Sequence, residues 1–270
     1  MKIFIFLLTS TILFLVLSCK QEVKLDASLV EIKLVVQCFI SPQDTVINVL
    51  VSQTSPIVGT VNGNNIKITN ALVTLSNGET TLNIPFVKEY YQLPITSAFR
   101  IEFGKVYTLK VTTPNGQSVE ATCEVPNMNI TERDLIVTVT SADKYDKKQL
   151  LLLWNDISGQ PNYYGVWTAV DKLNPKCSVG ATSYISDLGK DGSQLSSATY
   201  FNTSCNLGSP KLKIYFGVYD DNFNKFYKTL NEQKQTQGVP FTENVQITTN
   251  VRGGYGVFAA YYVITKVINY

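Results

Sequence analysis

KVYTLKVTTPNGQSVEATCEV, residues 105–125, consists of two runs in which apolar and polar side chains alternate. Alternation with a period of two is typical of strands that bury one face. The two runs are separated by Pro114-Asn115-Gly116-Gln117, and an Asn-Gly pair supplies the positive φ values that a tight hairpin requires. We therefore expect a β-hairpin here, with strands at 105–112 and 118–125.

The residues that precede this hairpin repeat the pattern. Ser76-Asn77-Gly78-Glu79 predicts a second hairpin, again through an Asn-Gly turn. The other alternating runs are 32–40, 45–53, 71–76 and 79–84, and residues 59–70 are expected to form a long polar loop. This many short strands within residues 31–126 predict an immunoglobulin-like or transthyretin-like β-sandwich.

A second β-rich domain is expected over residues 127–270, because Pro126 and the polar residues after it interrupt the pattern. Its strands are predicted at 135–140, 149–155, 163–170, 211–219, 244–249 and 256–268. Apolar side chains at helical spacing, Phe223, Phe226, Tyr227 and Leu230, follow the capping candidates Asp220, Asp221 and Asn222. We expect one amphipathic helix over residues 222–235.

The beginning of the chain resembles a bacterial lipoprotein signal. Lys2 precedes an uncharged apolar run, residues 3–17, and Ser18 lies directly before Cys19. We predict a signal peptide over residues 1–18, acylation of Cys19 as the attachment to a membrane, and a flexible stalk over residues 19–30. An ordinary secretory signal and a short membrane anchor are the alternatives.

Composition argues against several functional classes. The sequence has no histidine, so it lacks the commonest zinc ligand, the usual general base and any Ser-His-Asp triad. The sequence has 23 basic and 21 acidic residues. Removal of the signal peptide removes Lys2, so the mature chain has a net charge of about +1. This balance gives no reason to expect nucleic acid as a partner. We predict a non-catalytic protein without a metal or other cofactor.

Four cysteines remain besides Cys19, an even number in an exported chain. Cys177 and Cys205 bracket a Ser-, Gly- and Asp-rich segment with weak periodicity, so we predict a disulfide that closes a long loop. Cys38 and Cys123 lie in the first and last predicted strands of the sandwich, each in register with inward apolar neighbours. They form either a second disulfide or two buried free thiols.

Candidate binding residues are aromatic. Exposed rings among Tyr163, Tyr164 and Trp167 would stack on sugars or anchor a protein interface, although adjacent rings on a strand usually face opposite sides. The acidic segments 187–192 and 220–224 are the sites to weigh for Ca²⁺, and a solvated turn and a helix cap are the preferred interpretations. Gly253-Gly254-Tyr255-Gly256 precedes a strand, which indicates a tight turn or bulge with close backbone packing and not a phosphate site.

Several short motifs resemble one family of unknown function, the Bacteroidota lipoproteins that are often encoded beside TonB-dependent outer-membrane receptors. The motifs are the Cys19 lipobox, Leu34-Val35-Val36, residues 70–75, 104–109 with 114–116, Trp154-Asn155-Asp156 with 162–164, and 250–258. The resemblance implies an outer-membrane location and a TonB-dependent receptor as partner. Lys20-Gln21-Glu22 matches a cell-surface export signal only in part, so the periplasmic and outer faces both stay open.

These observations favour a lipid-anchored accessory or binding subunit of a transporter. The alternative is a free-standing surface protein that binds glycans or peptides through its outward aromatic side chains. An enzyme that works through carboxylates ranks last, because the sequence places no two acids at a catalytic separation.

Overall fold

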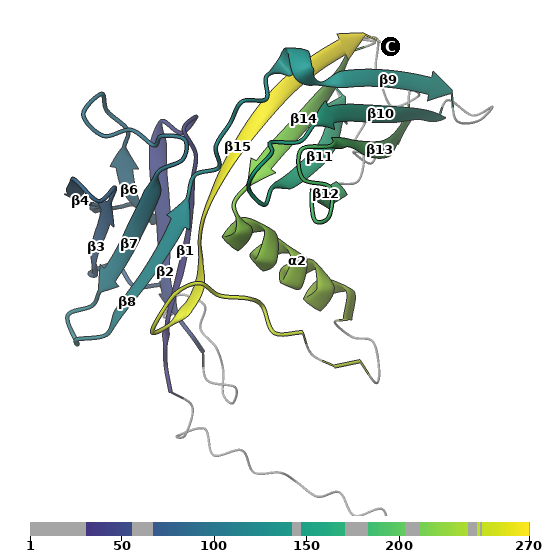
Figure 1. The fold of residues 1–270 in the computed structure, drawn as a ribbon. Helices are drawn as coiled ribbons and strands as arrows, with labels where there is room; N and C mark the ends of the chain where they lie inside the picture. Colours follow the sequence, from purple (N-terminus) through teal and green to yellow (C-terminus); the bar gives the residue numbers. More distant parts are fainter. Residues whose placement is uncertain are drawn as a thin grey trace, which may run out of the picture. The chain divides into compact units, whose positions relative to one another are not determined.

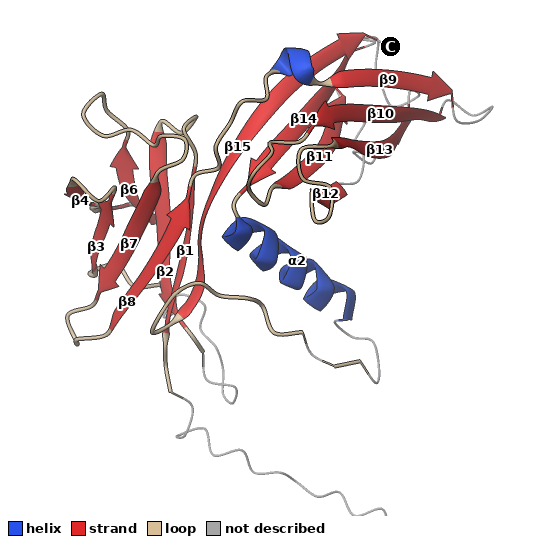
Figure 2. Cartoon of the chain, viewed as in Figure 1, coloured by secondary structure: helices blue, strands red, loops and turns tan. Residues whose placement is uncertain are grey.

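Strands form most of the chain that the structure describes (Figures 1 and 2). The computed structural model describes residues 31–55, 67–141, 147–170, 183–202, 211–236, 242–243 and 245–269. Its strands are β1 (Leu34–Ile40), β2 (Val46–Gln53), β3 (Leu72–Ser76), β4 (Thr81–Asn83), β5 (Phe86–Val87), β6 (Tyr90–Pro94), β7 (Val106–Thr112), β8 (Ser118–Glu124), β9 (Ile136–Ser141), β10 (Lys147–Asn155), β11 (Tyr163–Val170), β12 (Ser183–Ser186), β13 (Gln194–Asn202), β14 (Lys211–Tyr219) and β15 (Tyr255–Asn269). These residues contain one α-helix, α2 (Asp221–Thr236), and one 3-10 helix, η3 (Glu132–Asp134). The prediction of a mainly β chain with one α-helix is confirmed.

The hairpin expected at residues 105–125 is present as β7 and β8. The strands pair antiparallel from Val106 opposite Glu124 to Thr112 opposite Ser118. Gly116 has a φ of 88°, and the Thr113 amide donates a hydrogen bond to the Gln117 carbonyl oxygen at 2.9 Å. The backbone therefore adopts at this turn the positive φ that Asn-Gly predicts.

The N-terminal strands form the predicted sandwich. The second hairpin joins β3 and β4, with a φ of 92° at Gly78. One sheet has the order β4-β3-β7-β8, and β1, β2, β6 and β5 form one end of an eight-stranded sheet. Inward side chains of both, such as Val36 and Val49 from the second and Val73 and Leu109 from the first, share one buried core. Alternating burial on each strand produces this arrangement.

Strand β15 joins this sandwich to the rest of the chain. Its first residues pair parallel with β1, from Val35 opposite Tyr255 to Ile40 opposite Ala260. Its remaining residues pair antiparallel with β14, from Tyr219 opposite Tyr261 to Lys211 opposite Asn269. Figure 1 shows β15 as one long strand that runs beside both. The eight-stranded sheet, in the order β12-β11-β14-β15-β1-β2-β6-β5, is continuous because of this single strand.

Side chains of β11 and β14 and of a three-stranded sheet, β13-β10-β9, form a second buried core. Trp154 at its centre is within 5.3 Å of the Tyr164 ring and 5.0 Å of the Phe216 ring, centroid to centroid. The first core draws on residues 34–125 with Val251, Phe258 and Ala260, and the second on residues 130–218 with Ile264. The predicted division between residues 126 and 127 lies between the main residue ranges of the two cores. Strand β15 contributes residues to both cores.

Helix α2 begins one residue before the expected start and ends one residue after the expected end. The Asp220 carboxylate accepts a hydrogen bond from the Phe223 amide at 2.8 Å, which makes Asp220 the N-cap. Phe223, Phe226 and Tyr227 pack around the ring of Phe39 on β1, as the helical spacing predicts. Among the described residues, no helix has both the length and the apolar character that a membrane span requires.

Three sequence predictions about strands are wrong. The segment between Cys177 and Cys205 is not one long loop, because it contains β12 and β13. The sequence did not indicate these strands, because polar side chains also occupy buried positions. On β13 every second side chain is buried, and the buried ones include Ser197 and Thr199. Residues 245–249, expected as a strand, have no strand pairing, and β5 and β6 were not predicted.

Cys38 and Cys123 are buried free thiols, so of the two alternatives the disulfide is absent. Strands β1 and β8 lie in different sheets. The two strands that pair with β1 are β2 and β15, so β8 is not beside it. Burial raises the pKa of both thiols far above the ordinary value, which keeps them protonated and unreactive. Cys19, Cys177 and Cys205 lie outside the described residues, so the predicted acylation and the second predicted disulfide stay predictions.

Candidate functional site

A groove of about 730 Å³ is the candidate binding site, and we call it the polar groove. It is lined by Val106, Thr122, Cys123, Glu124, Pro126, Asn127, Gln160, Pro161, Asn162, Tyr163, Tyr219, Asp220, Asp221, Asn222 and Lys225. These residues come from the β7–β8 hairpin and the segment after it, from the start of β11 and the segment that leads into it, and from the end of β14 and the beginning of α2. Its size is that of a small-ligand site.

Asp220 lies in this groove with only 9% of its surface exposed. Burial raises the pKa of its carboxyl from 3.8 to about 7, although hydrogen bonds from the Phe223 amide and the Asn222 side chain oppose the shift. A buried acid with a pKa near neutrality is a common feature of functional sites. Here the same carboxylate caps α2, which is a sufficient structural reason for its position.

Charged and phenolic groups occupy the edge of the groove beside Asp220. The Lys225 ammonium lies 2.5 Å from the Asp221 carboxylate, one helical turn away. Burial raises the pKa of Tyr163 to about 12, and its hydrogen bond to Asp221 adds to the shift. The lining holds three carboxyl groups, of Glu124, Asp220 and Asp221, against the single ammonium of Lys225. The groove therefore has an acidic balance.

Amide side chains supply further polar groups. The Asn127 amide donates to the Gln160 side-chain oxygen at 3.4 Å. The Asn222 amide donates to the Thr122 carbonyl oxygen at 3.0 Å and fixes the beginning of α2 against β8. Amides both donate and accept hydrogen bonds. A ligand with hydroxyl or peptide groups fits this lining.

The three predicted binding aromatics do not form one site. Tyr163 lines the polar groove. Tyr164 points to the opposite side of β11 and is completely buried in the second core. Trp167 is on the same side of β11 as Tyr163, but its ring stacks on Tyr215 at 5.3 Å, with 12° between the planes. The alternation of a strand separates adjacent rings, as the sequence analysis expected.

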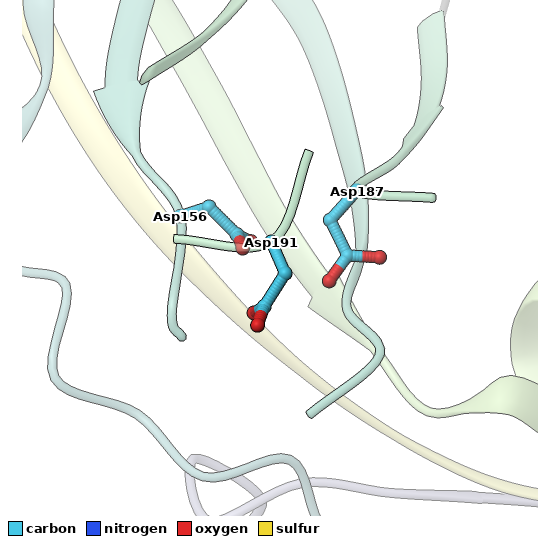
Figure 3. Close-up of side chains that lie close together, drawn as sticks. All are labelled: Asp156, Asp187 and Asp191. Atoms are coloured by element: carbon cyan, nitrogen blue, oxygen red, sulfur yellow. The ribbon is translucent and has the colours of Figure 1, made fainter. Parts of the chain in front are cut away.

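Three carboxylates, of Asp156, Asp187 and Asp191, lie close together in the second β-rich part, with one oxygen of each within 4.8 Å of the others (Figure 3). Burial and the neighbouring acids raise the pKa of Asp187. Hard cations such as Ca²⁺ prefer oxygen ligands of this kind. The sequence indicated residues 187–192 as an acidic segment but did not place Asp156 beside them. The pairing of Asn155 with Gln194 brings Asp156 there.

Backbone amides already bind each of these carboxylates. Gly192 donates to Asp156 at 2.8 Å, Asn162 to Asp187 at 2.9 Å and Gly159 to Asp191 at 2.8 Å. The Tyr164 hydroxyl also donates to Asp156, at 2.5 Å. These bonds connect the segments 156–162 and 187–192, so tying two loops together accounts for the cluster.

We expect the Tyr164→Phe substitution to test this role. It removes the hydroxyl that binds the buried Asp156 and leaves the ring in the core, so the free energy of unfolding should fall by about 1–3 kcal/mol. Chemical denaturation measures this change. Tyr255→Phe, at an exposed ring, is the control and should stay within about 0.5 kcal/mol of the parent. Equal stability of the two variants would contradict the proposed tie.

Comparisons with known proteins identify a family for this chain. A family model described as "Domain of unknown function (DUF4249)" matches residues 20–266. No curated protein sequence matches the chain. Solved structures with local likeness include a chitinase, ChiA74, from Bacillus thuringiensis, with a TM-score of 0.18 and 9% identity over 57% of this chain and 24% of the chitinase. Another is a Salmonella alpha-2-macroglobulin mutant, with a TM-score of 0.27 and 6% identity over 87% of this chain and 15% of that protein. The calcium-binding domain CBD12 of CALX1.1 has a TM-score of 0.19 and 10% identity over 84% of this chain and 98% of that domain. The chain thus spans less than a quarter of the chitinase and the macroglobulin.

Proposed function

This chain belongs to the family described as domain of unknown function DUF4249, and we propose that it is a lipid-anchored, non-catalytic binding subunit of the outer membrane. The observation that carries the proposal is the sequence Val16-Leu17-Ser18-Cys19 at the end of an uncharged apolar run. A thiol in that position is the acceptor of acyl chains in lipoproteins. Each buried methylene contributes about 0.8 kcal/mol, so several chains give lasting attachment.

Two features support a binding role over a catalytic one. The sequence has no histidine. The buried acid of the polar groove, Asp220, is engaged as the N-cap of α2, and the three clustered aspartates are engaged by backbone amides. The groove itself offers amides, carboxylates and a tyrosine to a ligand. We propose that it contributes to recognition of the partner or its cargo.

A TonB-dependent outer-membrane receptor is the proposed partner, and this part of the proposal rests on the resemblance of the sequence motifs. The test is to isolate the intact lipoprotein from gently solubilised outer membranes and to identify bound proteins by mass spectrometry. We expect one receptor in a stoichiometric amount. If the lipoprotein is recovered alone under mild detergent, the accessory role is wrong.

The second candidate is a free-standing surface protein that binds glycans or peptides, and the tyrosine and amide lining of the polar groove favours it. Tyr163→Ala and Asn127→Ala would remove groove contacts, whereas Trp167→Ala would alter an aromatic pair outside it. Glycan and peptide arrays with the three variants separate the sites. If a ligand is found and its affinity falls only in Trp167→Ala, the groove is not the binding site.

Lipid attachment has a separate prediction. In cells fed an alkyne-labelled fatty acid, the parent chain should incorporate the label and the Cys19→Ala chain should not, because that thiol is the proposed acceptor. In-gel fluorescence measures the label. Cys177→Ala is the matched control and should keep it. Labelling of Cys19→Ala at the parental level would refute the anchor.

A further inference from the structure

Strand β9 presents an unprotected edge. It lies at one side of the three-stranded sheet β13-β10-β9 and pairs with β10 alone among the described strands. Its sequence, Ile136-Val137-Thr138-Val139-Thr140-Ser141, has no charge, proline or glycine. Such an edge presents unpaired backbone N–H and C=O groups, which are a template for another strand.

The other sheet edges are short, charged or near another sheet. Strands β4, β5 and β12 have two to four residues each. Strand β8 carries Glu120 and Glu124, and Glu120 forms an isolated bridge and an ion pair with Arg252. Strand β13 lies close to β11 and β12. Short strands, charges and coverage are the usual protections of an edge. β9 has six residues and no charge of its own, and the Lys266 ammonium of β15 reaches only the carbonyl oxygens of Glu132 and Leu135, which precede it.

The two faces of β9 differ. Val137 and Val139 are partly buried and pack against the second core. Ile136, Thr138 and Thr140 are exposed, and 54% of the Ile136 surface is accessible. A strand added beside β9 therefore has to keep apolar residues on the Val137 side. The side chains opposite Val137 and Val139 also have to be uncharged.

β9 itself meets these requirements. If two copies of β9 lie antiparallel about Thr138, Val137 of one lies opposite Val139 of the other, and Ile136 lies opposite Thr140. The partly buried faces then coincide, no two charges meet, and Thr138 lies opposite Thr138. We propose that β9 is an interface between two copies of this chain, which pair in this register. This inference goes beyond the proposed function and does not depend on it.

The contact is small. Six residues on each side bury far less than the roughly 1,200 Å² of a stable interface, so the pairing is weak in dilute solution. It is favoured where copies are concentrated. Site-directed cross-linking, which traps transient pairs, is therefore a better test than size measurement.

The test uses single cysteines in the full-length chain, cross-linked in membranes and after purification with a short bis-maleimide. Thr138→Cys should give covalent dimers, since each thiol faces its copy. Thr140→Cys alone should give few, and a mixture of Ile136→Cys and Thr140→Cys chains should give the heterodimer. The unsubstituted chain measures the background of its own cysteines, and Cys38 and Cys123 are buried.

A disrupting variant completes the test. Thr138→Lys places like charges opposite each other in the paired copies. Added to both the Ile136→Cys and the Thr140→Cys chains, it should reduce the yield of their cross-linked heterodimer by about fivefold, whereas Thr138→Val should not. Unfolding curves check that both variants fold. If Thr138→Cys gives no dimer, if Thr140→Cys self-links as readily, or if β9 cysteines link only to a different protein, the proposed pairing is wrong.

Discussion

Gly256→Ala is expected to destabilise the fold by about 3–5 kcal/mol, a large part of the stability of an ordinary domain. Gly256 has a φ of 116°, a backbone conformation that L side chains rarely adopt. A Cβ at this position would also overlap the carbonyl oxygen of Val36, its partner in the parallel pairing of β1 and β15. Val36 cannot retreat, because β1 also pairs with β2 on its other side.

Denaturant unfolding of the parent and the variant measures this effect, and loss of soluble folded protein would be its extreme form. Gly116→Ala and Gly78→Ala are matched controls, since both residues have positive φ and nothing lies within 4 Å of an added Cβ. They bear the backbone strain without the overlap, so each should lose only about 1–2 kcal/mol. If Gly256→Ala loses no more than these controls, close packing of β15 on β1 is not important for stability.

Asp220→Asn is expected to change how stability depends on pH. The folded state holds the Asp220 proton up to a pKa of about 7, whereas the unfolded chain releases it near 3.8. Between these values the folded state binds more protons, so the free energy of unfolding of the parent falls as the pH rises. The loss from this group is complete above about pH 7 and amounts to as much as about 4 kcal/mol.

Asparagine keeps a side-chain oxygen for the Phe223 amide but does not ionise. From pH 5 to pH 8 the free energy of unfolding should therefore fall in the parent but not in the variant, so the difference between them should grow in favour of the variant. Thermal or urea unfolding at several pH values measures this difference. Asp221→Asn removes the neighbouring charge that contributes to the raised pKa of Asp220, so the fall in stability should end at a lower pH than in the parent but should not disappear. Parallel profiles for Asp220→Asn would mean that Asp220 is already ionised well below neutrality in the folded protein.

Features set by neighbouring residues could be predicted from the sequence. Asn115-Gly116 predicts its hairpin because the turn depends on those two residues, and the aromatic spacing after Asp220 predicts both the face and the cap of α2. The close packing near Gly256 also followed from three glycines that precede a strand. In each case the interaction lies within a few positions of the residue that indicates it.

Features set by distant pairing could not be predicted. Nothing local to Val36 indicates that its partner is Gly256, and an apolar β1 fits either a β8 or a β15 neighbour equally well. The polar groove has the same origin, since Asn127, Tyr163 and Asp220 are gathered from three segments. Asp156 joins Asp187 only because β10 pairs with β13. Alternation gives the face of a strand but not its neighbour.

The pairing of β1 with β15 also limits the order of events during folding. About 220 residues separate Val36 from Gly256, so closing this contact carries a high entropic cost and depends on almost the whole chain. Until residues 255–260 are available for pairing, β1 has only β2 beside it and its other edge stays open to foreign strands. A chaperone that shields extended segments would act longest on this strand. A chain that terminates before residue 255 should aggregate readily and be sensitive to proteases, because this edge of β1 has no partner.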